Sequence, residues 1–278
     1  MAKERLDKVL VERGLAETRQ RAQAMIMAGL VFSGTERLEK PGRLIPSDLE
    51  IAIKDRLPYV GRGGLKLAEA LDAFGLDIRG RICADIGSST GGFTDCLLQR
   101  GAELVYAVDV DTRQIDPVLR RDPRVALVEK NARDLAAADF PRMPRIVTLD
   151  VSFISVLKIL PALKRIADTN PVSETDIPSP DRGPFVALAL IKPQFEAERG
   201  RVGKKGVIRD PEIHRQTLEK VAAGAAVLGF RLRRLLKCST PGQKGNREFF
   251  ALWSLEGLPP ERNIVLKWIE EVIRDEKN

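Results

Sequence analysis

The sequence predicts an α/β protein, in which a doubly wound parallel sheet with helices on both faces follows a small α+β domain. Two observations lead to this fold class. From Ile82 onward, apolar runs of strand length alternate with helix-like segments, which is the rhythm of βαβ units. Before that point, apolar residues first have helical spacing and then fall into short pieces. The length of 278 residues suits one catalytic domain and one small accessory domain.

Residues 1–56 are expected to form the small domain, with two short helices followed by short strands. Gly14 separates two groups of apolar residues at helical spacing: Leu6, Val9, Leu10 and Leu15, then Ala22, Met25, Ile26 and Leu30. Glycines and prolines divide the stretch up to Ile53 into pieces of strand length. Residues 57–62 are expected to be a linker and residues 63–278 the larger domain.

The larger domain is expected to contain a series of strands separated by helices. The strands are predicted at residues 82–86, 104–110, 125–128, 146–149 and 186–191, with late strands at 231–236 and 248–253 closing the sheet. The proline-rich stretch 168–184 is expected to be a surface loop, and residues 260–278 a final helix.

The composition favours a polyanionic partner and excludes several classes of protein. The formal net charge is +7 and the isoelectric point is about 9.4. No apolar run approaches the roughly 18 residues of a membrane helix, and the N-terminus lacks the pattern of a signal peptide, so a cytoplasmic protein is expected. Cys83, Cys96 and Cys238 form no close pair, which predicts buried, reduced thiols, no disulfide and no metal site.

A glycine-rich turn is the strongest sign of a ligand site. Asp85 ends the first strand of the larger domain, and Gly87, Ser88, Ser89, Gly91 and Gly92 follow before a helix. Asp109 ends the next strand, where a carboxylate accepts hydrogen bonds from ribose hydroxyls. These features predict an adenosine-type ligand, the alternative being a turn with a capping aspartate. Asn131, after the third strand, is either an adenine contact or a turn residue.

Charged residues stand at the ends of later strands, where a doubly wound sheet carries its functional crevice. Asp150 and Lys192 follow two apolar strands, and a lysine there is costly to bury unless it faces such a crevice. Glu248 begins a late strand, and Lys66 lies in the helix before the first one. The alternatives are a helix cap for Asp150 and solvated ends of secondary structure for Lys66 and Glu248.

Five sequence blocks in order carry a resemblance over nearly the whole chain. They are residues 59–67 (YVGRGGLKL), 87–95 (GSSTGGFTD), 150–155 (DVSFIS), 191–196 (IKPQFE) and 245–249 (GNREF). In these blocks the chain resembles the hemolysin A (TlyA) family of ribosomal RNA 2′-O-methyltransferases, and the larger domain is similar to FtsJ (RrmJ). The resemblance implies a Rossmann-like methyltransferase sheet, S-adenosylmethionine as cofactor, and ribosomal RNA or ribosomal subunits as partner, with a cytidine ribose as target.

The resemblance also implies roles for individual residues. The family's catalytic tetrad falls on Lys66, Asp150, Lys192 and Glu248, with Lys192 activating the ribose hydroxyl, Asp150 and Lys66 positioning it, and Glu248 orienting a lysine. The expected cofactor contacts are Asp85, Gly87, Ser88, Ser89, Gly91, Gly92, Asp109 and Asn131.

Residues 1–56 resemble the S-four RNA-binding module, which gives the small domain its expected function. Arg5, Arg19 and Arg21 are expected to face RNA phosphates, the alternative being a solvated helix face. Arg62 in the linker is expected to meet RNA. Phe153 is expected either to stack on a flipped base or to lie in the core.

Three other functions compete with this interpretation. They are a membrane-active cytolysin, which the family's historical name suggests, an RNA-binding factor without catalysis, and a nicotinamide dehydrogenase. The glycine spacing argues against the dehydrogenase, since it does not match G-x-G-x-x-G. The single histidine, His214, is expected at the surface, in a helix start rich in charge.

Overall fold

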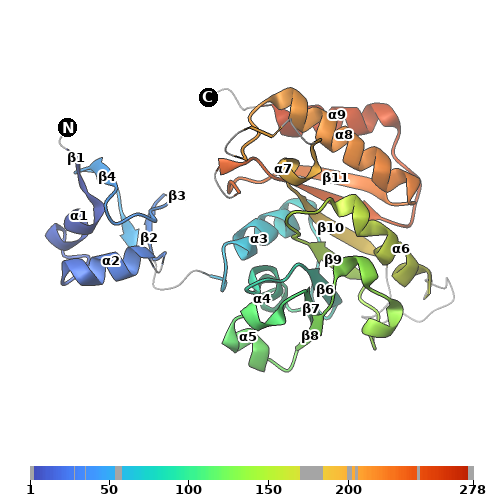
Figure 1. Ribbon diagram of the computed structural model, residues 1–278, viewed down its shortest axis with the longest axis horizontal. Coiled ribbons are helices and arrows are strands. Elements are labelled where there is room, and N and C mark those ends of the chain that lie inside the picture. Colours follow the sequence, from blue (N-terminus) through green and yellow to red (C-terminus); the bar gives the residue numbers. More distant parts are fainter. Residues whose placement is uncertain are drawn as a thin grey trace. The chain divides into compact units, whose positions relative to one another are not determined.

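The computed structural model describes residues 3–27, 29–34, 36–53, 58–169, 184–198, 202–203, 206–242 and 245–274. The chain divides into two compact units, Met1–Tyr59 and Val60–Asn278, and each has its own hydrophobic core (Figure 1). Most of the predicted loop at 168–184 lies outside the described residues.

The first unit is built from two helices and short antiparallel strands, as the sequence predicts. Its elements are β1 (Lys3–Arg5), α1 (Leu6–Glu12), α2 (Arg19–Met27), β2 (Val31–Ser33), β3 (Glu36–Arg37), β4 (Leu44–Pro46) and β5 (Ala52–Ile53). β1 pairs with β4, and β2 lies between β3 and β5. Leu6, Leu10 and Ile26 are fully buried, so the predicted helical spacing does form the core.

The second unit contains one mixed sheet of seven strands in the order β11-β12-β10-β9-β6-β7-β8. The strands are β6 (Ile82–Ile86), β7 (Leu104–Asp109), β8 (Val125–Glu129), β9 (Ile146–Leu149), β10 (Val186–Ile191), β11 (Arg231–Lys237) and β12 (Phe249–Ser254). The first five are parallel, whereas β12 runs antiparallel to both β10 and β11. The predicted strands are therefore present, but the sheet is mixed and not wholly parallel.

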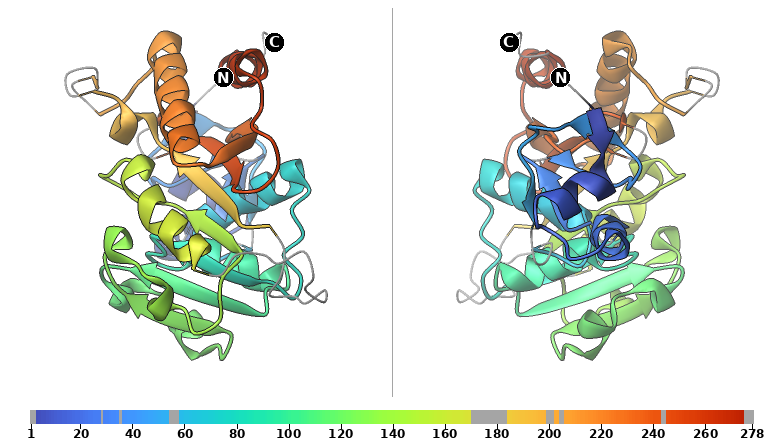
Figure 2. Two further views of the ribbon diagram at one scale, coloured as in Figure 1. Left: turned by 90° about the vertical axis from the view of Figure 1, so that its right-hand side faces the viewer. Right: turned by 90° about the vertical axis from the view of Figure 1, so that its left-hand side faces the viewer.

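Helices pack on both faces of this sheet (Figure 2). The helices are α3 (Gly63–Phe74), α4 (Gly92–Gln99), α5 (Pro117–Arg121), α6 (Leu160–Asp168), α7 (Pro193–Glu196), α8 (Pro211–Val227) and α9 (Arg262–Ile273). Ile82, Ala84 and Ile86 of β6 share a core with α6 and α8. The intervening Asp85 points to the other face and contacts Thr94 of α4. This alternation is the two-residue period of a strand covered on both sides.

The strand order reverses next to β6, which lies between β7 and β9. The chain moves from β6 to β7 and β8 on one side, then returns to β9 and β10 on the other. Open α/β sheets bind ligands at such a switch point, outside the carboxyl ends of the strands. At this edge Gly87, Asp150 and Lys192 follow β6, β9 and β10, and Asp109 is the last residue of β7.

The prediction that His214 lies at the surface is wrong. Its side chain is fully buried on α8, and its ring meets that of Phe249 edge-on at 5.6 Å. His214 shares the inner face of the helix with Thr217, Leu218 and Val221, so helical position outweighs the charged residues beside it. The three cysteines are free and buried, as predicted. In the described part of the chain, no helix is long and apolar enough to span a bilayer.

Candidate active site

In the glycine-rich turn after β6, the backbone lies close to the backbone of β7 and of the segment after β9. Gly87 and Gly91 have φ angles of 84° and 96°, a conformation that favours glycine. The N–H groups of Gly87 and Ser88 donate to the carbonyl of Val108 at 2.8 and 3.1 Å. A Cβ atom on Gly87 would lie 2.6 Å from the carbonyl oxygen of Asp150. The glycine-rich turn therefore packs directly against the segment that follows β9.

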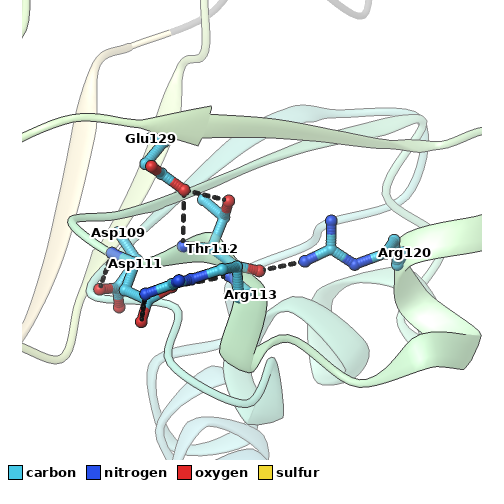
Figure 3. A network of polar contacts seen from close by, with 6 residues as sticks. All are labelled: Asp109, Asp111, Thr112, Arg113, Arg120 and Glu129. Atoms are coloured by element: carbon cyan, nitrogen blue, oxygen red, sulfur yellow. Dashed lines mark hydrogen bonds and ion pairs between the residues drawn. The ribbon is translucent and has the colours of Figure 1, made fainter.

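Asp109 links this turn to the loop after β7. Its Oδ2 accepts the N–H of Ser89 at 2.8 Å, and its Oδ1 accepts the N–H of Asp111 at 3.2 Å. In the same loop, the hydroxyl of Thr112 donates to Glu129 at 2.8 Å (Figure 3). Each Asp109 oxygen has a second lone pair, so the carboxylate is held in place and still accepts hydrogen bonds.

Two other predicted cofactor residues have different surroundings. The hydroxyl oxygen of Ser88 is buried without a hydrogen-bond partner among the described residues, which fits a site that a polar ligand completes. The amide oxygen of Asn131 accepts the N–H of Arg133 at 3.1 Å and caps a short 3₁₀ helix, Ala132–Asp134. Asn131 thus performs the turn role that the sequence leaves open for it.

Asp85 lies beneath the turn and not on open surface. Its side chain is fully buried, and its two oxygens accept hydrogen bonds from the hydroxyls of Thr94 at 2.7 Å and Thr148 at 3.1 Å. Burial raises the pKa of Asp85 from 3.8 to about 7, because the low-dielectric interior disfavours the charged form. The carboxyl joins α4, β6 and β9 immediately under the glycine-rich turn.

Asp85 should make the stability of the folded protein depend on pH. Because its pKa is higher in the folded chain, the folded state binds the proton more tightly, and the stability from this group falls as pH rises from about 4 to about 7. Replacing Asp85 by Asn removes this dependence. Urea unfolding at pH 5 and pH 8 should show the variant gaining stability relative to wild type at the higher pH. If the difference in unfolding free energy between wild type and Asp85→Asn is the same at both pH values, the raised pKa of Asp85 is contradicted.

A pocket of about 260 Å³ opens beside the turn and contains the four predicted catalytic residues. The pocket is lined by Arg62, Gly63, Lys66, Asp150, Ser152, Phe153, Lys192, Gln194, Phe195, Thr240, Pro241 and Glu248. These residues come from the start of α3, the segments after β9 and β10, and the segment before β12. The fold thus assembles parts of the chain that are far apart in sequence.

Each lysine of the pocket is paired with its own carboxylate. Lys192 Nζ lies 2.7 Å from Asp150 Oδ1 and donates to the hydroxyl of Ser152 at 3.0 Å. Lys66 Nζ donates to Glu248 Oε2 at 2.7 Å, and the Glu248 side chain is only 3% exposed. Each pair joins side chains of opposite charge, so the partly buried pocket contains no excess of either charge among these four residues.

Phe153 stands at the mouth of the pocket in a strained conformation. It is 90% exposed and has a φ of 64°, which is unusual for a residue with a bulky side chain. Its ring lies 4.9 Å from that of Phe195. Of the two roles predicted for Phe153, core residue and base-stacking residue, this position excludes the core. Strain and exposure together are typical of functional positions.

Sequence reasoning did not single out two residues that lie at or beside the pocket. Glu196 accepts the hydroxyl of Ser155 at 2.5 Å and the N–H of Val156 at 2.7 Å, so it ties the segment after β10 to the one after β9. Gln194 lines the pocket with a buried amide oxygen that has no hydrogen-bond partner in the described part of the chain. Both lie within the block IKPQFE, but only side-chain geometry distinguishes them from its other members.

The predicted RNA-binding arginines lie in both units. Arg62 lines the catalytic pocket of the second unit. Arg5 and Arg19 of the first unit are hydrogen bonded to the same carboxylate, that of Asp7, whereas Arg21 is an exposed residue in the first turn of α2. No group of three or more potential metal ligands occurs among the described residues.

Two family models match the chain, one for each unit. The model described as FtsJ-like methyltransferase matches residues 59–254, and the model described as S4 domain matches residues 4–51. The first match contains every residue of the catalytic pocket, and the second contains Arg5, Arg19 and Arg21.

Curated proteins and solved structures are similar over most of the chain. YqxC of Bacillus subtilis is 46% identical, over 97% of this chain and 94% of that protein. The 16S/23S rRNA (cytidine-2′-O)-methyltransferase TlyA of Mycobacterium tuberculosis is 39% identical, over 90% and 88%. Hemolysin A of Brachyspira hyodysenteriae is 38% identical, over 89% and 98%. A solved structure from Streptococcus thermophilus is 40% identical, with a TM-score of 0.70 and coverage of 98% and 96%.

Proposed function

Because the chain belongs to the FtsJ-like methyltransferase family, and within it to the group that contains TlyA and hemolysin A, we propose that it methylates a ribose 2′-hydroxyl in ribosomal RNA. The methyl donor is S-adenosylmethionine, and the target is a cytidine, as in the names of the TlyA relatives. The observation that carries the proposal is the convergence of Lys66, Asp150, Lys192 and Glu248 in one pocket beside the glycine-rich turn.

The glycine-rich turn and Asp109 are the proposed cofactor site. Gly87, Ser88, Ser89, Gly91 and Gly92 offer backbone without bulky side chains, and Asp109 accepts hydrogen bonds from the ribose hydroxyls of the cofactor. When bound, S-adenosylmethionine supplies an electrophilic methyl group on a positively charged sulfur. We assign Asp85 to positioning the turn from below, because its carboxyl is buried, and Asn131 to the edge of the site.

The catalytic pocket supplies proton transfer and alignment. The ribose hydroxyl is a weak nucleophile. Lys192 is the proposed general base: it first releases to solvent the proton that it holds in the ion pair with Asp150, and its Nζ then accepts the proton that the hydroxyl loses. Asp150 and Ser152 hold Lys192 in place at 2.7 and 3.0 Å. Lys66, oriented by Glu248, donates to the ribose oxygen and keeps it in line with the methyl group. Each member of the tetrad thus has at least one partner that fixes its side chain.

RNA reaches this pocket through contacts in both units. Phe153 is the proposed platform for the flipped target base, and Arg62 meets the neighbouring backbone. Arg5, Arg19 and Arg21 in the S4 domain contact phosphates elsewhere on the substrate. A ribosomal RNA substrate implies that the protein works in the cytoplasm on ribosomal subunits or their RNA. The division into residues 1–56, 57–62 and 63–278 remains part of this proposal.

Removing the Phe153 ring should weaken RNA use without affecting the cofactor. Base stacking on an aromatic side chain contributes about 1–3 kcal/mol, so Phe153→Ala should raise KM for RNA by about 5- to 150-fold. Because the ring is 90% exposed, thermal stability should stay near that of wild type. Steady-state methyl transfer and calorimetric cofactor binding measure the two effects. Phe153→Trp, which keeps a stacking surface, is the matched control and should retain activity. A KM for RNA in the alanine variant equal to that of wild type would contradict the stacking role.

The proposed function is tested by transfer of labelled methyl from S-adenosylmethionine to ribosomal RNA. Purified small and large subunits, and the free RNA of each, are incubated with the protein, digested to nucleosides and separated. We expect label in 2′-O-methylcytidine. Mapping the modified position then identifies which subunit is the substrate and whether free RNA suffices.

Other outcomes favour other functions. Cofactor binding together with RNA binding, but without label in any RNA, would favour the RNA-binding factor without catalysis. Because one relative is named Hemolysin A, leakage of dye from liposomes should be measured with the same preparation. Leakage without methyl transfer would overturn the proposal in favour of membrane activity.

A further inference from the structure

The S4 domain contains a buried carboxylate that organises two arginines. Asp7 lies in α1 with a fully buried side chain. Its Oδ1 accepts the Nε–H of Arg5 at 3.0 Å. Its Oδ2 accepts three further N–H groups, from Arg5 Nη2 at 2.9 Å, Arg19 Nε at 3.0 Å and Gln23 Nε2 at 2.8 Å. The hydrogen bond from Arg5 is the main reason that the pKa of Asp7 lies well below its usual range, so the carboxylate is charged in the folded chain.

The two guanidinium groups keep most of their donors available. The side chains of Arg5 and Arg19 are 45% and 56% exposed. Within the described structure, Arg19 donates only through its Nε–H, so its two terminal nitrogens have no partner there. Arg5 donates through Nε and Nη2, so its Nη1 has no partner there. Two cations share one anion, so the cluster carries one net positive charge. A second anion would satisfy the remaining N–H groups.

The position of Arg5 is fixed from a second side. A Cβ atom on Gly42 would lie 3.2 Å from Arg5 Nη1 and 3.5 Å from its Cζ, so the guanidinium rests against the turn that precedes β4. The backbone supports this arrangement, since the N–H of Asp7 donates to the carbonyl of Pro41 at 3.0 Å. Arg5 therefore lies between a carboxylate and a turn, and little side-chain freedom remains to be lost when it binds a ligand.

Other basic residues of α1 are already engaged within the domain. Lys8 forms ion pairs with Glu4 at 2.9 Å and with Glu12 at 3.2 Å. Arg13, at the end of the helix, donates to the carbonyls of Leu49 at 2.7 Å and of Ser47. The charge of Lys8 is balanced and the donors of Arg13 face the domain itself. Arg5 and Arg19 are distinguished from them by anchored side chains with outward donors.

We propose that Arg5 and Arg19 form a single binding site for one RNA phosphate, and that Asp7 is the positioning residue that builds it. The phosphate oxygens accept hydrogen bonds from both guanidinium groups at once, in the paired geometry that arginine favours with phosphate. Gln23 and Gly42 help to hold the pair in place. This inference rests on the proposed RNA substrate and deepens it by assigning a defined ligand to part of the S4 domain.

Replacing Asp7 by Asn should weaken binding to RNA, whereas the change in charge alone would strengthen it. Replacing Asp7 by Asn removes a negative charge, which by itself strengthens binding to RNA. If Asp7 instead positions the two arginines, the variant binds RNA more weakly, because Arg5 and Arg19 lose their common anchor. The affinity of full-length protein for a fluorescently labelled ribosomal RNA fragment, measured by anisotropy, decides between these signs. Tighter binding by a folded Asp7→Asn protein would overturn the proposal.

The salt dependence tests whether the two arginines share one phosphate. Arg5→Gln and Arg19→Gln should each weaken binding about tenfold and each lower the slope of log affinity against log salt by about one. The double variant should lower the slope by no more than either single variant. A double variant whose slope falls by about two would show separate phosphates and would refute the shared site. Lys8→Gln, which also removes one positive charge, is the matched control and should bind nearly as wild type.

Two controls distinguish loss of the phosphate site from misfolding and from failure of the proposed function. If circular dichroism shows that Asp7→Asn does not fold, Gly42→Leu replaces it, since its Cβ begins 3.2 Å from Arg5 Nη1 and the larger side chain must displace the guanidinium without changing charge. Wild-type affinity in that variant would contradict the proposal. Methyl transfer and cofactor binding are measured on every preparation. Failure of the wild-type protein to bind RNA at all would refute the proposed function. Wild-type binding with unchanged arginine variants would refute only the shared phosphate site.

Discussion

Replacing Lys192 by Ala is expected to lower kcat for methyl transfer by about 10²- to 10⁴-fold, the usual contribution of a general base. Lys192 Nζ lies in the pocket 2.7 Å from Asp150, and in the proposed mechanism it accepts the proton of the ribose hydroxyl. The glycine-rich turn follows a different strand, so the affinity for S-adenosylmethionine should remain that of wild type. Single-turnover methyl transfer and calorimetric cofactor binding measure the two quantities separately.

Two further variants separate proton transfer from charge. Lys192→Arg keeps a cation that pairs with Asp150 but stays protonated, so it should be nearly as inactive as the alanine variant. Substantial activity in Lys192→Arg would show that the residue acts only through its charge. Lys267 is an exposed lysine on α9 that does not line the pocket, and Lys267→Ala should have wild-type activity.

Replacing Gly87 by Ala is expected to abolish measurable cofactor binding and methyl transfer together. The new Cβ atom would lie 2.6 Å from the carbonyl oxygen of Asp150 and 3.1 Å from its carbonyl carbon. Both are backbone atoms, so either the cofactor turn or the segment that carries Asp150 must move. Strain and overpacking should also cost about 1–3 kcal/mol of unfolding free energy. Calorimetry and urea unfolding measure these losses.

Gly75 provides a matched control for the conformational part of this effect. Its φ of 63° also favours glycine, but a Cβ atom there would meet nothing within 4 Å. Gly75→Ala should therefore cost about 1–2 kcal/mol of stability and leave cofactor binding and kcat unchanged. Similar losses of activity in both alanine variants would mean that strain alone, and not the contact with Asp150, explains the requirement for Gly87.

The strands could be predicted from the sequence because their signal is local. The predicted strands at 82–86, 146–149 and 186–191 have the bounds seen in the structure, since buried parallel strands are continuous apolar runs between turns. Sheet order is not local. The insertion of β12 between β10 and β11, antiparallel to both, follows from packing across the whole unit, and the pattern of residues 249–254 does not contain that information.

The residues of the candidate site could be predicted from the sequence, but the contacts between them could not. Strand-end positions led to Asp150 and Lys192, yet which carboxylate pairs with which lysine depends on distances across the pocket. Asp85 is buried because its side chain faces α4, where it accepts a hydrogen bond from Thr94. The exposure of Phe153 follows from a backbone conformation that bulky side chains rarely adopt. None of these contacts has a period or spacing that a sequence pattern reveals.

The Lys66–Glu248 ion pair also constrains how the enzyme folds. It joins residues 182 positions apart, and Glu248 directly precedes the strand that enters the sheet between two others. Closing so large a loop is slow compared with forming helices and neighbouring parallel strands. We therefore expect the glycine-rich turn to form before Glu248 reaches Lys66. A chain in which this pair has not yet formed should transfer no methyl group, because Lys66 is not yet oriented.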